Sequence, residues 1–242
     1  VNDFDWPDPE KYIDPVKCRQ VVEEVPEDAV PMVLAWSAHF QDACAAFGME
    51  TALIKMMTEP EMFKAVIDRI MQFYLKANEI FYESTKGKLK AVLIGNDFGS
   101  QQGLMLSPAL IRELVFPGTK QLIDQAHAYG LKVIHHSCGC IYDIIPDLIE
   151  LGADAIHPIQ ALAHNMEAER LARDFGGKAS FCGGVDAQNL MVHGTPDQII
   201  AEVKRLAGLF PTGLIISPSH EAILPDTPPA NVEAIFTGVH SL

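Results

Sequence analysis

The feature that most constrains the fold of this chain is a regular alternation of short apolar runs with helical patterns. Six runs of strand length, rich in apolar and β-branched residues, occur at 32–36, 91–95, 131–135, 153–157, 179–183 and 214–217. Apolar residues at three- and four-residue spacings follow them, at 60–84, 108–129, 141–151, 166–175, 196–207 and 229–240. Such alternation is typical of right-handed βαβ crossovers, so it predicts an α/β fold with a parallel sheet.

The number of strands points to an incomplete barrel. Six predicted strands are two short of a closed (β/α)8 barrel, and a chain of 242 residues with 48% hydrophobic content is of barrel size. Because the sequence begins at Val1 rather than at Met, we expect a TIM barrel that lacks its first two βα units. Residues 1–242 are predicted to form one domain, with an irregular, acidic lead-in over 1–30. Within the helical patterns, Pro117 predicts a break and Gly208 a helix end.

Charge and cysteine usage narrow the classes of partner. A net charge of −14 with scattered basic residues disfavours nucleic acid and anionic membrane surfaces. No apolar run reaches the roughly eighteen residues of a membrane span. Five cysteines without the dense spacing of a disulfide scaffold favour free thiols in a reducing compartment. We therefore expect a soluble, cytoplasmic protein that acts on a small-molecule substrate and associates with other copies, since an open barrel exposes apolar strand edges.

The third apolar run ends in Leu131-Lys-Val-Ile-His-His-Ser-Cys-Gly139. Residues two apart point to the same face of a strand, so His136 and Cys138 can present an imidazole and a thiolate to one point. This pair is half of a metal site. His135 is predicted to face the opposite side, and Cys140 is a candidate third ligand only if the backbone stays extended past Gly139.

Further polar residues follow the other strands at their C-terminal ends, which is the edge where parallel α/β folds build active sites. Asp97 is predicted to orient substrate or to accept from the second nitrogen of a metal-binding histidine, with a helix N-cap as its alternative. Glu221 is predicted to act as a general acid/base or as a metal ligand. The predicted contacts to cofactor or substrate are Gln101, His157, Gln160 and Asp186. Backbone capping is the alternative for His157 and Asp186.

Several motifs, taken in chain order, resemble the uroporphyrinogen decarboxylase superfamily. They are Gly95-Asn-Asp-Phe-Gly-Ser-Gln101, His136-Ser-Cys-Gly139, Gly152-Ala-Asp154, Gly183-Gly-Val-Asp186, Ser217-Pro-Ser-His-Glu221 and Pro225-Asp-Thr-Pro-Pro229. The resemblance covers nearly the whole chain and implies a (β/α)8 barrel that is longer at its N-terminus. It also implies one of two chemistries: metal-free decarboxylation of uroporphyrinogen, or zinc-dependent methyl transfer between a methylated corrinoid and a thiol or related acceptor.

The methyltransferase branch of this superfamily is similar in its His-x-Cys pair, which His136 and Cys138 match. Those enzymes have a second Cys near the end of the last strand, where this chain has Ser219-His220. Imidazole is also a good zinc ligand, and three protein ligands leave the open position that catalytic zinc requires. The resemblance therefore implies a zinc site of His136, Cys138 and His220, with a corrinoid protein as a partner.

The decarboxylase branch is similar at the position where the methyltransferase branch departs. Its members carry a His near the end of the last strand, which His220 matches. Those enzymes lack the His-x-Cys pair. A substrate with many carboxylates also needs cationic contacts, and the arginines here lie in the lead-in or in helical patterns. We expect methyl transfer, with decarboxylation and a non-catalytic corrinoid- or partner-binding member as the alternatives.

Overall fold

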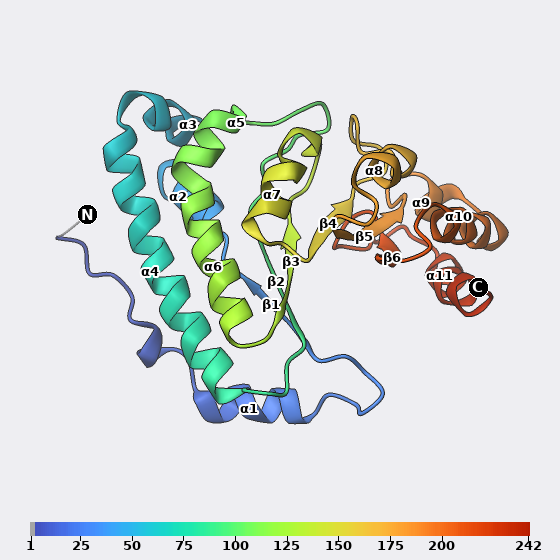
Figure 1. The fold of residues 1–242 in the computed structure, drawn as a ribbon, viewed down its shortest axis with the longest axis horizontal. Coiled ribbons are helices and arrows are strands. Elements are labelled where there is room, and N and C mark those ends of the chain that lie inside the picture. Colours follow the sequence, from blue (N-terminus) through green and yellow to red (C-terminus); the bar gives the residue numbers. More distant parts are fainter. Residues whose placement is uncertain (1–2) are drawn as a thin grey trace. The chain divides into compact units, whose positions relative to one another are not determined.

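A computed structural model describes residues 3–242 of the chain (Figure 1). Its described residues contain six strands in one sheet, in the order β1-β2-β3-β4-β5-β6. They are β1 Met32–Trp36, β2 Ala91–Gly95, β3 Lys132–His136, β4 Ala155–Ile159, β5 Ser180–Val185 and β6 Leu214–Pro218. The pairs β1–β2, β4–β5 and β5–β6 are parallel. The predicted α/β fold with a parallel sheet is therefore confirmed.

Helices precede, connect and follow the strands. They are α1 Pro15–Glu23, α2 His39–Phe47, α3 Met49–Thr58, α4 Pro60–Ser84, α5 Pro108–Leu110, α6 Phe116–Ala128, α7 Ile145–Leu151, α8 Ala168–Phe175, α9 Leu190–His193, α10 Pro196–Leu209 and α11 Pro229–His240. Short 3-10 turns lie at Pro9–Lys11 and Tyr142–Ile144. Within residues 3–242, none of the helices combines the length and apolarity that a membrane-spanning segment needs.

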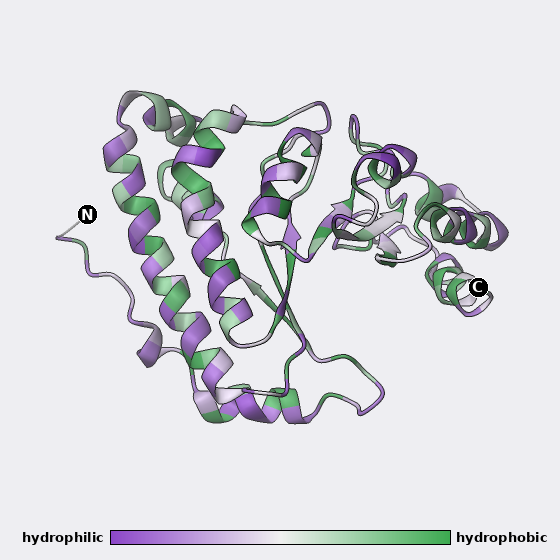
Figure 2. Ribbon diagram, viewed as in Figure 1, coloured by the Kyte–Doolittle hydropathy of each residue, from purple (hydrophilic) through white to green (hydrophobic). Residues whose placement is uncertain are grey.

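The described chain divides into two compact units. The first runs to Asn96 and adds Leu106–Ile134 and Glu150–Ala153, and the second comprises Asp97–Met105, His135–Ile149 and Asp154–Leu242. In the first unit α4 packs against α1, α2, α3 and α6. Hydrophilic and hydrophobic bands alternate along α4 (Figure 2), as its helical spacing predicts. In the second unit α10 packs against α8, α11, β5 and β6. The single barrel domain over 1–242 stays a prediction.

The two strands at the ends of the sheet are its least buried strands. Every residue of β4 is buried, whereas in β1 the side chain of Leu34 is 66% exposed and in β6 that of Ile215 is 48% exposed. Both exposed residues are large and apolar. The described sheet thus ends on either side in a strand with one hydrogen-bonded neighbour.

Several predicted bounds are confirmed to the residue, namely those of β1, β2, α4 and α11. The other four strands differ from their predicted runs, and β5 and β6 end later than expected, at Val185 and Pro218. β3 ends one residue later than expected, at His136, and β4 ends two residues later, at Ile159. As a result, His136 is the last residue of its strand and His157 lies inside the next one.

The segment predicted as an irregular lead-in contains a helix, so that part of the prediction is corrected. The Asp14 carboxylate accepts hydrogen bonds from the N–H groups of Val16 and Lys17 at the start of α1. Pro15 takes the first helical position, where its missing N–H has no intrahelical partner. Residues 1–2 lie outside the described chain.

Pro117 does not end the helical path, and this prediction is also corrected. α5 passes into a π-helical turn, Ile111–Val115, in which the Phe116 N–H donates to the Ile111 carbonyl five residues back. Pro117 lies in the first turn of α6, where a proline is tolerated. The expected break is therefore a change of helix type. Gly208 likewise lies within α10, which ends at Leu209.

Candidate functional site

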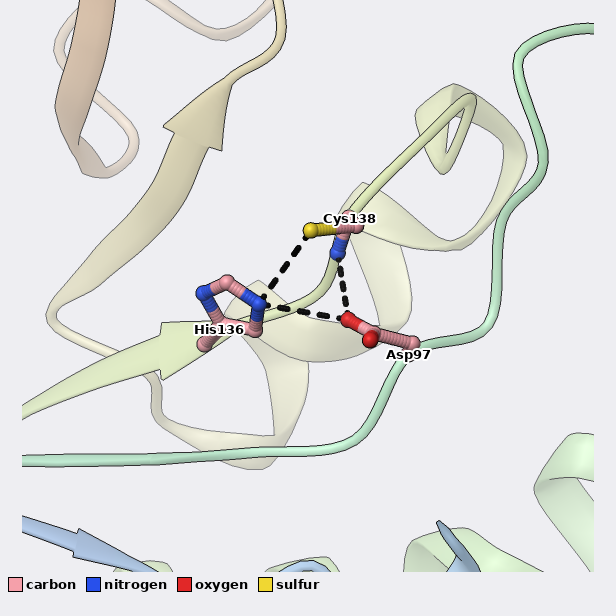
Figure 3. A group of neighbouring side chains, drawn as sticks. All are labelled: Asp97, His136 and Cys138. Atoms are coloured by element: carbon pink, nitrogen blue, oxygen red, sulfur yellow. Dashed lines mark hydrogen bonds and ion pairs between the residues drawn. The ribbon is translucent and has the colours of Figure 1, made fainter. Parts of the chain in front are cut away.

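Three side chains that the sequence singles out lie together in the second unit (Figure 3). His136 ends β3, Cys138 follows it, and Asp97 lies on the loop after β2. The Cys138 Sγ is 3.4 Å from the His136 Nε2, and the Asp97 Oδ1 is 3.2 Å from the same nitrogen. Asp97 Oδ1 also accepts a hydrogen bond of 2.8 Å from the Cys138 N–H. The structure thus brings an imidazole, a thiol and a carboxylate to one point.

A second group joins the first at Cys138. It consists of Cys138, His220 and Glu221, and in each group the potential ligand atoms lie within 4.8 Å of one another. Glu221 Oε2 is 3.5 Å from His220 Nε2, 3.8 Å from Cys138 Sγ and 4.0 Å from His136 Nε2. His136 and His220 belong to different groups, and Glu221 lies near both. The three expected zinc ligands therefore do not form one group, and Cys138 is the member that the two groups share.

Main-chain packing holds Asp97 next to Cys138. A Cβ on Gly139 would lie 2.4 Å from the Gly99 carbonyl carbon, and a Cβ on Gly99 would lie 2.7 Å from the Cys138 oxygen. Gly139 also has a φ of +82°, which favours glycine. The Cys140 N–H donates to the Ser100 carbonyl and the Phe98 N–H to the Ser137 hydroxyl. The loop after β2 and the turn after β3 are thus in direct backbone contact.

The electrostatics of this cluster oppose a thiolate and favour a cation. Burial raises the pKa of the Cys138 thiol, and the negative charges of Asp97 and Glu221 raise it further. Burial also acts to raise the pKa of Asp97, but hydrogen bonds from His136 and from the Cys138 N–H outweigh it and hold that pKa below its usual value. Asp97 is therefore ionised at neutral pH beside a protonated thiol. A divalent cation bound at the Cys138 sulfur would instead favour the thiolate over the thiol.

The second nitrogen of His136 contacts His157 on β4. The two Nδ1 atoms are 2.7 Å apart, and both side chains are buried. Burial lowers the pKa of His157 to about 4, with a further contribution from His136 and His220. The sequence predicts a substrate contact or backbone capping for His157. For Asp97 it predicts substrate orientation or a hydrogen bond to a metal-binding histidine, with an N-cap as the alternative. Asp97 lies at the Nε2 of His136, on the Cys138 side.

The other expected contacts divide into those near the cluster and those away from it. Gln160 is buried and its Oε1 accepts from the Gly139 N–H at 2.6 Å, so it supports the Cys138 turn. Asp186 accepts hydrogen bonds from the N–H groups of residues 188–190, which is the capping alternative. The Gln101 side chain is exposed, and its main-chain oxygen accepts from the His164 N–H. Cys140 is buried outside both groups.

A small cavity of about 250 Å³ borders the second group. Its lining residues are Gln160, Ala187, Gln188, Ser219, His220, Ala222 and Leu224, and none of these described residues is Lys or Arg. Ser219 holds the loops after β5 and β6 together, because its hydroxyl accepts from the Ala187 N–H and its own N–H donates to the Val185 carbonyl. Sequence reasoning missed Ala187, Ala222 and Leu224, since apolar loop residues carry no chemical signal. The volume is below the roughly 300 Å³ at which pockets for drug-sized ligands begin.

Comparisons with known proteins agree with the motifs. A family model described as Uroporphyrinogen decarboxylase (URO-D) matches residues 7–242. Curated relatives include uroporphyrinogen decarboxylases of Chlamydia trachomatis serovars L2 and D, each 27% identical over 184 residues, which are 76% of this chain and 51% of the relative. A methyltransferase from Methanosarcina mazei has a similar fold, with a TM-score of 0.73 and 17% identity over 93% of this chain and 62% of that chain. The chain spans about half the length of the curated relatives that it matches.

Proposed function

The chain belongs to the uroporphyrinogen decarboxylase family, and we propose that within it the protein acts as a zinc-dependent methyltransferase. The reaction would transfer a methyl group between a methylated corrinoid, carried by a partner protein, and a thiol or related acceptor. The observation that supports this proposal is that Cys138 belongs to two groups of potential metal ligands. In each group the imidazole, thiol and carboxylate ligand atoms lie within 4.8 Å of one another.

The donor types fit zinc, and the pair His136 and Cys138 also fits its spacing. Imidazole nitrogen, thiolate sulfur and carboxylate oxygen are the ligands that zinc takes in proteins. Nitrogen and sulfur donors of a tetrahedral zinc site are about 3.5 Å apart, given the usual bond lengths. The Cys138 Sγ and His136 Nε2 are 3.4 Å apart. We propose that His136 and Cys138 hold the metal together with His220, while Asp97 and Glu221 supply the negative charge around it.

The residues around the cluster suggest how an acceptor would be handled. When bound, zinc would keep an acceptor thiol deprotonated at neutral pH, which makes its sulfur nucleophilic. His220 and Gln160 line the cavity in which a small acceptor would bind. Glu221 has a side chain that is 44% exposed and lies 3.5 Å from His220. We propose that it takes up, at Oε2, the proton that the acceptor loses.

Metal analysis with a matched pair of cysteine variants tests the proposal. We expect stoichiometric zinc in the purified chain and its loss in Cys138→Ala, because Cys138 belongs to both groups. Cys182→Ala is the control, since Cys182 lies outside both groups and its sulfur contacts the Ser217 hydroxyl. The measurement is elemental analysis of the dialysed proteins. A native chain that carries no stoichiometric transition metal would contradict the proposal.

Uroporphyrinogen decarboxylation is the second candidate, because the curated relatives carry that name. The two functions differ in how they depend on Cys138. Release of carbon dioxide from uroporphyrinogen that is unchanged in Cys138→Ala would favour decarboxylation. Loss of methylcorrinoid absorbance in the presence of a thiol, abolished in Cys138→Ala, would favour methyl transfer. Binding of a corrinoid without either turnover would favour the non-catalytic alternative.

A further inference from the structure

The two ring nitrogens of His136 have different surroundings. Nε2 faces Asp97, Cys138 and Glu221, at 3.2 Å, 3.4 Å and 4.0 Å. Nδ1 faces the opposite way and lies 2.7 Å from the Nδ1 of His157. The His136 side chain is fully buried and His157 is 6% exposed. Each nitrogen of His136 therefore has a defined protein neighbour.

The contact between the two Nδ1 atoms leaves room for one proton. Two N–H groups facing each other at this distance would clash, and two lone pairs would repel, so one nitrogen donates and the other accepts. An imidazole that gives a lone pair to a metal through Nε2 carries its proton on Nδ1. If His136 binds metal through Nε2, its Nδ1–H must donate to His157, and His157 then carries its own proton on Nε2.

We propose that His157 is a positioning residue that holds His136 in the Nδ1–H tautomer and so keeps Nε2 available to a metal ion. This inference rests on the zinc site of the proposed function. Asp97 acts in the opposite sense, because a carboxylate oxygen 3.2 Å from Nε2 favours a proton on that nitrogen. His157 and Asp97 thus compete for the tautomer of His136, and His157 favours the one that binds metal.

The backbone keeps the two histidines in register. The Ser137 N–H donates to the His157 carbonyl at 2.8 Å, next to His136 in the sequence. The ring centroids are 4.9 Å apart and the rings are tilted by 39°. Because both rings are buried, removal of the acceptor on His157 would take away this hydrogen bond of the His136 Nδ1–H where water cannot readily replace it. Metal affinity would fall, because His136 must carry this Nδ1 proton when its Nε2 binds the metal.

Three variants separate this role from simple packing. In His157→Leu the acceptor is lost, and we expect zinc affinity to fall roughly 10- to 100-fold, as for other residues that orient a metal ligand. In His157→Asn the amide oxygen can accept the same hydrogen bond, so most of the affinity should return. His193→Leu, at an exposed histidine in α9, should leave the affinity unchanged. Affinity is measured by competition with a chromogenic chelator.

A second readout needs no variant. Nitrogen-15 NMR of the zinc-loaded native chain should show His136 with a protonated Nδ1 and a metal-bound Nε2. A bare Nδ1 in that state, or zinc affinity in folded His157→Leu equal to native, would overturn the inference while the zinc site stands. A native chain that binds no zinc would instead overturn the proposed function, and this inference with it.

Discussion

At the scale of single residues, the candidate site depends most on the charge around the Cys138 sulfur. Two carboxylates, Asp97 and Glu221, raise the pKa of this thiol beyond the effect of burial. A sulfur in such surroundings is a poor nucleophile without a cation, because the thiolate is the reactive form. The same negative charge would strengthen the binding of a divalent metal.

This view predicts how Cys138 reacts in the metal-free chain. Glu221→Gln removes one of the two charges, so the pKa of the thiol should fall toward its ordinary value and more thiolate should be present at each alkaline pH. We expect faster alkylation of Cys138 by iodoacetamide and a pH–rate profile shifted to lower pH, with a chelator present. Glu233→Gln, in α11, should leave the profile unchanged. An identical profile in Glu221→Gln would show that the carboxylate does not act on the sulfur.

Residue spacing explains why part of this site is predictable from the sequence. His136 and Cys138 are two apart at a strand end, so their convergence follows from the period of a strand. The contact between His136 and His157 does not, because it depends on the pairing of β3 with β4. The sequence places both residues at strand ends but cannot specify which nitrogen faces which neighbour.

At the scale of elements, the turn after β3 is fixed by its contact with the loop after β2. Gly139→Ala should therefore cost well over the roughly 1–2 kcal/mol that left-handed backbone costs a non-glycine residue. The added Cβ would lie 2.4 Å from the Gly99 backbone and would push the loop that carries Asp97 away. Gly177→Ala is the matched control, since Gly177 has a φ of +76° and nothing within 4 Å of an added Cβ. Urea unfolding measures both changes.

Equal losses of stability in the two variants would contradict this account of the turn. Zinc affinity gives a further check, because displacement of the Asp97 loop should weaken binding in Gly139→Ala while Gly177→Ala binds as the native chain does.

The bounds of a helix or strand are predictable where one sequence signal is strong. The 25 residues of α4 keep a helical period throughout, and Pro60 marks their start. β4 ends two residues later than expected, because the prediction ended it before Pro158. The strand continues past this proline, and its register with β5 shifts between Ile156 and Ile159. A proline lacks the N–H that a regular ladder needs, so local sequence alone could not show that the strand resumes.

At the scale of the whole molecule, the exposed edge strand β1 predicts association between copies. An edge strand with unpaired backbone groups and exposed apolar side chains favours pairing with another chain. Leu34→Lys should therefore lower the fraction of oligomer in sedimentation velocity experiments. Met57→Lys is the control, because Met57 is 74% exposed but lies on α3. A native chain that is monomeric at all concentrations, or an equal effect of both variants, would contradict the prediction.

The alternation of apolar runs was enough to predict the α/β fold and its parallel sheet. It was not enough to predict the π-helical turn, because such turns leave no pattern that differs from an α-helix with a proline. The helix α1 was missed for a related reason. Its signal is the single pair Asp14-Pro15, within a segment whose composition favours irregular structure.

The π-helical turn Ile111–Val115 also sets which face of α6 packs against α4. A π turn holds one residue more than the α turn that it replaces, so it behaves as a one-residue insertion within a helix. Each added residue rotates the following helix by about 100°. Deletion of one residue from this turn would therefore present a different face of α6 to α4.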